Sequence, residues 1–130
     1  MQLGAAGDTA VMQTQVVLKV KELCLESQGC ARRIAAAKFG KMIFERDAHR
    51  YTRSRIDCIL LADTLDDEFF RSAALQPIIE LCMMGRDVDD ARALLKHVKI
   101  AFIRNKIIDA FPELSPEFLA SFQHYAIAAE

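Results

Sequence analysis

Hydrophobic residues recur at spacings of three and four along most of the chain, and this pattern predicts an all-α protein. The clearest stretch is 88–111, which contains neither glycine nor proline. Asp87 precedes it as a candidate N-cap, and Asp89 and Asp90 fall in its first turn, where the helix dipole favours negative charge. As a single helix this stretch would be about 36 Å long, the width of a small domain.

The apolar face of this stretch changes direction halfway along it. At about 100° per residue, the first stripe consists of Ala91, Leu94, Leu95, Val98, Ala101 and Phe102, and the second consists of Ile100, Ile103, Ile107 and Phe111. A helix that is apolar on more than one side must be covered on more than one side. We therefore predict a compact single-domain all-α bundle of five to six helices around one long central helix at about 88–111.

The second stripe has two alternative explanations. An apolar patch that a small domain does not cover marks a contact surface, which predicts a partner or self-association interface in a homodimer. The same side chains form ordinary core if other helices of the chain cover them. The sequence leaves both alternatives open for Ile100, Ile103, Ile107 and Phe111.

In the N-terminal third of the chain, the sequence predicts a flexible arm followed by a helix. Residues 1–7 are small and are expected to form a flexible N-terminal arm, ahead of a single helical domain over 8–130. The first helix of this domain is expected to start at Asp8 or Thr9. Gly29 suits the left-handed position that follows a helix, so the first helix is expected to end just before it.

Further signals predict the remaining helices. A second helical stretch is expected over about 31–61, where apolar residues keep the helical spacing. Thr64 is the expected N-cap of a short helix, because acids fill the turn after it. Pro77 suits the first turn of another helix, and Ser115 followed by Pro116 predicts the start of the last one.

The turn over 81–91 ends one helix on Gly85 and starts the next with acids followed by Ala91. This turn resembles the one inside helical-hairpin repeats of the tetratricopeptide and pentatricopeptide kind. The resemblance covers about 20 residues and occurs once, whereas a solenoid needs several stacked copies. It implies an antiparallel helix pair at this point and no family for the whole chain.

Composition narrows the class of protein. Apolar residues make up 52% of the chain, enough for a core, while five glycines and three prolines leave little material for the turns of an all-β fold. No apolar run approaches the roughly 18 residues of a membrane span, and 1–20 contain no secretory signal. The four cysteines lack C-x-x-C and zinc spacings, so we expect free thiols and a cytoplasmic location.

Charge is segregated along the chain although the net charge is only −1. Eight bases and two acids lie within 32–55, and nine acids and two bases lie within 57–90. A basic surface would suit an acidic partner or a nucleic-acid backbone, but a pI near 6.3 favours pairing between the blocks. The candidate basic contact surface consists of Arg46, Arg50, Arg53, Arg55, Arg92, Lys96 and Lys99.

No motif predicts catalysis, a cofactor or a metal. The chain lacks a serine nucleophile elbow, a phosphate-binding glycine loop and a dinucleotide fingerprint. Glu45 and His49 could supply two metal ligands at most, short of a protein site. We therefore expect a non-enzymatic regulator, adaptor or inhibitor that binds a protein partner and forms a homodimer. The alternative is a nucleic-acid-associated regulator that uses the basic segment 46–55.

Overall fold

The computed structural model describes residues 3–38 and 45–118, which contain helices and no strand. The elements are α1 (Leu3–Ala37), α2 (Glu45–Asp63), α3 (Glu68–Met84), α4 (Val88–Leu95), α5 (Ala101–Ala110) and a 3-10 turn, η1 (Pro112–Leu114). The prediction of an all-α bundle is confirmed. Within these residues no helix combines the length and the hydrophobicity that a membrane span needs.

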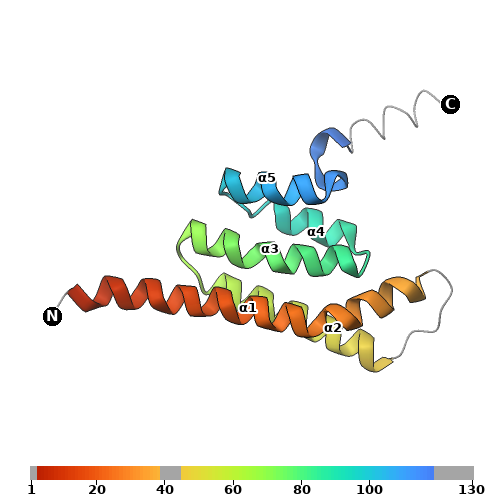
Figure 1. Ribbon diagram of the computed structural model, residues 1–130, viewed down its shortest axis with the longest axis horizontal. Helices are drawn as coiled ribbons and strands as arrows, with labels where there is room; N and C mark the ends of the chain where they lie inside the picture. Colours follow the sequence, from red (N-terminus) through yellow and green to blue (C-terminus); the bar gives the residue numbers. More distant parts are fainter. Residues whose placement is uncertain (1–2, 39–44, 119–130) are drawn as a thin grey trace.

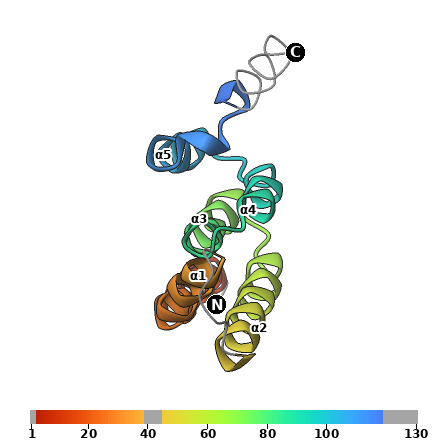
Figure 2. The same cartoon turned by 90° about the vertical axis from the view of Figure 1, so that its right-hand side faces the viewer.

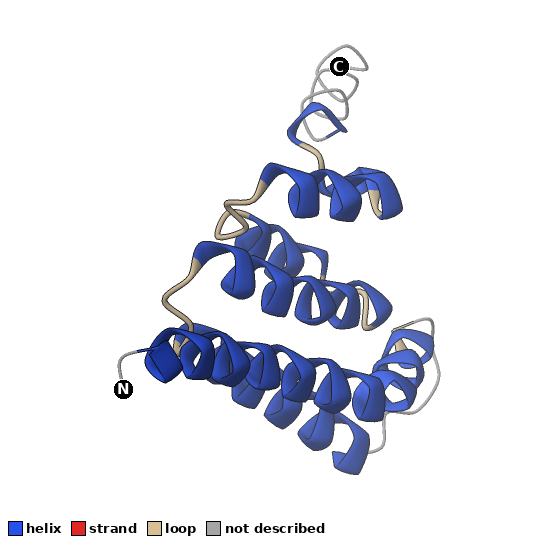
Figure 3. Cartoon of the chain, turned by 60° about the vertical axis from the view of Figure 1, so that its left-hand side comes forward, coloured by secondary structure: helices blue, strands red, loops and turns tan. Residues whose placement is uncertain are grey.

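The helices form two layers that lie side by side. Within each layer the helices follow one another from one end of the molecule to the other. Helices α1, α3 and α5 form one layer, and α2 and α4 form the second (Figures 1 and 2). Figure 3 shows the stack, with α1 and α2 at one end and α5 towards the other. Helix α3 contacts α1, α2, α4 and α5, so it is the central helix of the bundle. Its Ile78, Ile79 and Leu81 are almost completely buried.

The prediction of one long helix over 88–111 is wrong, because residues 96–100 separate α4 from α5. Val98 is fully buried in this connection. The backbone N–H of Lys99 donates to Ser72 Oγ of α3 at 3.2 Å, which holds the connection against the central helix. The change of direction lets Ile103 and Ile107 of the second stripe pack in the core, whereas Ala101 and Phe102 of the first stripe are exposed.

Helix α1 continues through Gly29, so the predicted helix end is also wrong. Ser27, Cys30 and Ala31 around the glycine are all buried. A glycine in a helix interior costs about 1 kcal/mol relative to alanine. Packing of the neighbouring side chains outweighs this cost.

The single helix predicted over 31–61 is two helices. Helices α1 and α2 lie on either side of 39–44, which are outside the described residues. Helix α2 then extends past the predicted end to Asp63. At the other end, α1 begins at Leu3, within the segment predicted as an N-terminal arm.

Helix α3 replaces two predicted helices. Its N-cap is Asp67 rather than Thr64, and Asp67 Oδ1 accepts from the backbone N–H of Phe69 at 2.8 Å. The helix continues through Pro77, which was predicted to start a new one. Because Ile78 and its neighbours are buried on several sides, tertiary packing holds the proline inside the helix.

The start of the last helix agrees with its prediction. Ser115 Oγ accepts from the backbone N–H of Phe118 at 3.0 Å, as an N-cap does, and Pro116 occupies the first helical position. The rest of this element, 119–130, lies outside the described residues.

Helices α3 and α4 form the pair that the turn sequence predicts. The backbone N–H of Asp87 donates to the carbonyl of Cys82 at 2.9 Å, and the N–H of Arg86 donates to that of Met83 at 3.1 Å. These two bonds define a Schellman motif, which closes the C-terminus of α3 and reverses the chain within three residues.

The left-handed residue of this turn is not its glycine. Arg86 adopts the left-handed conformation, with φ of 64°, whereas Gly85 has φ of −83°. Glycine is required at position 85 for another reason. A Cβ there would collide with the hydroxyl group and ring of Tyr51, which packs against the turn from α2.

We expect Gly85→Ala and Gly29→Ala to change stability in opposite directions. The new methyl at position 85 would displace a rigid aromatic side chain and should lower the free energy of unfolding by about 1–3 kcal/mol. At position 29 the nearest side-chain atom, Arg33 Nη1, is 3.4 Å away and flexible, so alanine should raise the free energy by up to about 1 kcal/mol. Urea unfolding followed by far-UV circular dichroism measures both, and a change of the same sign in both variants would contradict the assignment.

Candidate functional site

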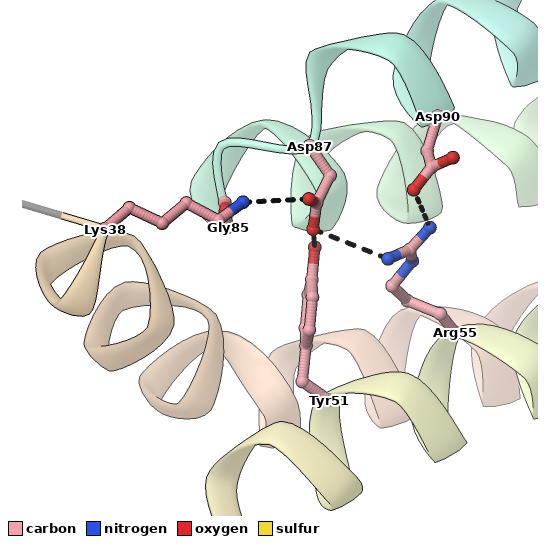
Figure 4. Close-up of polar contacts among 6 residues, drawn as sticks. All are labelled: Lys38, Tyr51, Arg55, Gly85, Asp87 and Asp90. Atoms are coloured by element: carbon pink, nitrogen blue, oxygen red, sulfur yellow. Dashed lines mark hydrogen bonds and ion pairs between the residues drawn. The ribbon is translucent and has the colours of Figure 1, made fainter. Parts of the chain in front are cut away.

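Asp87 lies where the α3–α4 turn meets α1 and α2, and its carboxylate accepts hydrogen bonds from both (Figure 4). Lys38 Nζ, just after α1, donates to Asp87 Oδ1 at 2.8 Å and to the carbonyl of Gly85 at 2.8 Å. From α2, the hydroxyl of Tyr51 donates to Asp87 Oδ2, and Arg55 Nη1 lies 3.4 Å from the same oxygen. We call these residues the Asp87 cluster. It fastens the turn to both helices of the neighbouring pair.

Arg55 forms ion pairs within this cluster and is not available as part of a free basic surface. Its side chain is 18% exposed, and Nη2 donates to Asp90 Oδ2 at 2.6 Å. The guanidinium group lies 5.1 Å from the ring centroid of Tyr51 in a cation–π contact. These contacts give Arg55 a structural role.

The charges of the cluster act on one another. Burial disfavours ionisation of Asp87, but hydrogen bonds from Lys38 and Tyr51 outweigh it, and the pKa of Asp87 falls below its usual range. Burial and the hydrogen bond to Asp87 raise the pKa of Tyr51. The aspartate is therefore the charged acceptor and the tyrosine the neutral donor at neutral pH.

Other members of the candidate basic surface also pair within the chain. Arg53 Nε lies 3.4 Å from Asp57 on the same helix. Arg92 lies 3.3 Å from Asp89 and donates to the carbonyl of Glu113 at 3.0 Å. The basic and acidic segments thus meet inside one chain at several points, as the second of the two sequence alternatives proposed.

The remaining candidate bases are exposed at two separate places. Arg46 and Arg50 lie at the start of α2, beside a shallow hollow that His49 also lines, and have no ion pair among the described residues. Lys96 and Lys99 lie in the connection between α4 and α5. The predicted surface is therefore divided and does not form one face.

The predicted self-association stripe is mostly core in this structure. Ile103 and Ile107 are buried, with 6% and 1% of their surface exposed. Ile100 and Phe111 are half-buried and pack against the same core. Because the break at 96–100 turns α5 towards α3, the stripe offers little exposed surface of its own.

A different apolar surface is exposed, and the sequence pattern did not single it out. Leu25 of α1 is 64% exposed and Phe102 of α5 is 70% exposed. Leu25 borders a hollow of about 350 Å³ between α1, α3 and α5, and Lys106, which lines it, lies 5.6 Å from the ring centroid of Phe102. We call this the α1–α3–α5 hollow. The other residues that line it are Lys21, Cys24, Gln28, Gln76, Pro77, Glu80 and Leu81.

The four cysteines are free and buried. Cys24 of α1 and Cys58 of α2 pack together, with their sulfur atoms 3.8 Å apart. The hydrogen bond to Cys58, followed by burial, raises the pKa of Cys24, and burial raises the pKa of Cys82 to about 11. Among the described residues no group of three or more His, Cys, Asp or Glu side chains is arranged to hold a metal ion.

No protein-family model, no curated protein and no solved structure matches the chain.

We expect Asp87→Asn to lower the free energy of unfolding by about 2 kcal/mol at neutral pH, because it removes the charged acceptor from two bases and a phenol. Asp89→Asn is the matched control. Asp89 is fully exposed and its ion pair with Arg92 at 3.3 Å is screened by solvent, so its loss should lower the free energy of unfolding far less than the loss of Asp87. Chemical unfolding of the three proteins at neutral pH gives both values, and equal losses would contradict a central role for Asp87.

The effect of Asp87→Asn should depend on pH. The folded-state pKa of Asp87 lies below its usual value of 3.8, so its stabilising contribution is complete above that value and is lost as the pH falls through the folded-state pKa. The difference in stability between the wild type and Asp87→Asn should be constant from about pH 7 to pH 5 and shrink below about pH 4. A difference that grows on acidification would contradict this assignment.

The thiols should react slowly while the protein is folded. Burial blocks access, and a pKa of about 11 for Cys82 leaves little of the thiolate that attacks disulfide reagents. We expect dithionitrobenzoate to label Cys82 at least roughly 100-fold more slowly in the folded protein than in urea, and the other three thiols slowly as well. A thiol that reacts in the folded protein at the rate of an unfolded peptide would contradict the observed packing.

Proposed function

We propose that this protein is a non-enzymatic interaction module, a small regulator or adaptor that binds a protein partner and self-associates through the α1–α3–α5 hollow. The observation that supports this most directly is the exposure of Leu25, which lines that hollow, and of Phe102, which contacts the lining residue Lys106. Large exposed apolar side chains next to a concave surface are typical of protein contact sites. Leu18, seven residues before Leu25 and 56% exposed, extends the apolar surface along α1.

The charges around the hollow suit a second copy of the same chain. Lys21 and Lys106 line it together with Glu80, so both signs of charge are present on one surface. Two-fold symmetry brings the same surface of two copies together. A lysine of one copy can then approach Glu80 of the other while the apolar side chains cover each other.

Nucleic-acid association is the second candidate. Of the basic segment 46–55, only Arg46 and Arg50 are without an ion pair in the described part of the chain, and His49 is exposed beside them. Two free bases would neutralise few phosphates, so any such binding should be weak and strongly dependent on salt. We therefore rank it below the protein contact.

Self-association can be tested by size-exclusion chromatography with light scattering over a series of concentrations. The wild type should form a dimer, and Leu25→Asp and Phe102→Asp should each weaken it at least about tenfold, because a buried charge would face the partner. Leu60→Asp is the matched control, since Leu60 is 60% exposed but lies on α2, in the other layer. Circular dichroism checks that each variant keeps its helices.

A wild type that remains monomeric at every concentration would exclude self-association through this surface. A dimer that resists both substitutions at the hollow but dissociates with Leu60→Asp would place the contact on α2. Nucleic acid that co-purifies with the wild type at low salt, and is lost with Arg46→Glu and Arg50→Glu, would favour the second candidate.

A further inference from the structure

We propose that a pocket between α4, α5 and η1 binds a carboxylate that carries a small aliphatic group. The pocket has a volume of about 220 Å³ and is separate from the α1–α3–α5 hollow, with which it shares no lining residue. The proposal therefore does not depend on self-association. It rests on the charge, the apolar walls and the size of the pocket.

Among the residues that the structure describes, three bases line this pocket and no acid does. They are Arg92 of α4, Lys96 just after α4, and Arg104 of α5. Lys96 and Arg104 have no ion-pair partner among residues 3–38 and 45–118. Elsewhere in the described chain, bases such as Lys38 and Arg55 are neutralised by acids within 4 Å. Uncompensated positive charge thus gathers at this pocket.

Contacts within the protein hold the side chain of Arg92 in place, but one of its hydrogen-bond donors has no partner among the described residues. One of its terminal nitrogens donates to the carbonyl of Glu113 at 3.0 Å, and the other lies 3.3 Å from the exposed carboxylate of Asp89. Its Nε atom is buried and has no hydrogen-bond partner among the described residues. A guanidinium group that is already oriented loses less side-chain entropy when it binds an oxyanion.

Apart from Ser115, the remaining walls of the pocket are apolar. Leu95 and Leu114 are buried, and Pro116 lies beside them. A cationic rim above apolar walls complements a molecule with a carboxylate at one end and a few carbon atoms at the other. The volume is below the roughly 300–1,000 Å³ of pockets that hold drug-sized ligands, which favours a small group over a nucleotide.

Such a group has two sources, a free short-chain acid and the last residue of a peptide chain. Both present a carboxylate next to aliphatic carbon, and capture of a peptide's C-terminal carboxylate is a known mode of peptide recognition. The shared chemistry is what the pocket recognises, and the experiment has to separate the two sources.

The test is a titration of the full-length protein, labelled with nitrogen-15, observed by NMR. Isovalerate should cause saturable shifts of amide signals from residues that line the pocket. Isovaleramide keeps the aliphatic group but lacks the charge, and inorganic phosphate keeps the charge but lacks the aliphatic group. Each should bind at least about tenfold more weakly than isovalerate.

Substitutions identify the pocket. Lys96→Gln and Arg104→Gln should each weaken isovalerate binding about tenfold, because each removes one charge-assisted contact. Lys99→Gln is the matched control, since Lys99 is an exposed base of the same connection that does not line the pocket. The NMR spectrum of each variant shows directly whether it is folded.

A further titration, with a dipeptide, distinguishes a peptide C-terminus from a free acid as the ligand. Acetyl-Gly-Leu that binds more tightly than isovalerate would identify a peptide C-terminus as the ligand, and the reverse would identify a free acid. The proposal is overturned if isovalerate causes no saturable shifts. It is equally overturned if isovaleramide or phosphate binds as tightly, or if Lys99→Gln weakens binding as much as Arg104→Gln.

Discussion

The arrangement of the helices depends on the contacts that the carboxylate of Asp87 makes with α2 and with the end of α1. This carboxylate compensates Lys38 beyond α1 and Arg55 of α2, and it accepts the hydroxyl hydrogen of Tyr51 (Figure 4). Charged side chains are costly to bury without a partner, and Arg55 is only 18% exposed. The α3–α4 turn therefore has one position at which all these charges are satisfied, and this position fixes how the second helix pair stacks on the first.

The backbone of the turn is adapted to the same contact. Tyr51 approaches so closely that position 85 has no room for a side chain, and the next residue, Arg86, adopts the left-handed conformation that closes the Schellman motif. A non-glycine residue in this conformation costs roughly 1–2 kcal/mol. The hydrogen bonds of the Schellman motif and of Asp87 offset this cost.

Much of the fold is encoded locally, and the errors have a common physical cause. The helical periodicity, the turn at Gly85 and the cap at Ser115 depend on neighbouring residues, and the structure agrees with them. Gly29 and Pro77 are local stop signals that buried neighbours override, because packing outweighs a cost of about 1–3 kcal/mol. The break at 96–100 depends on Ser72, a partner on another helix that no local pattern reveals.

The candidate sites were harder to predict for the same reason. Whether a base is free depends on acids that are distant in sequence, so Arg55 was assigned to the surface although Asp87 and Asp90 neutralise it. The exposure of Phe102 follows from the break before α5, since an unbroken helix would have kept this residue on the same stripe as Leu95.

In the folded protein, unpaired positive charge is concentrated at a different place from the one that the sequence indicates. In the sequence the largest excess of bases lies within 32–55, but acids of α2, of the α3–α4 turn and of α4 neutralise several of these residues. The segment 91–108 contains five bases and no acid, and the structure gathers three of these bases around one apolar pocket. An acidic ligand would therefore be drawn to the α4–α5 end of the stack, where field and shape coincide, rather than to the segment with the most bases.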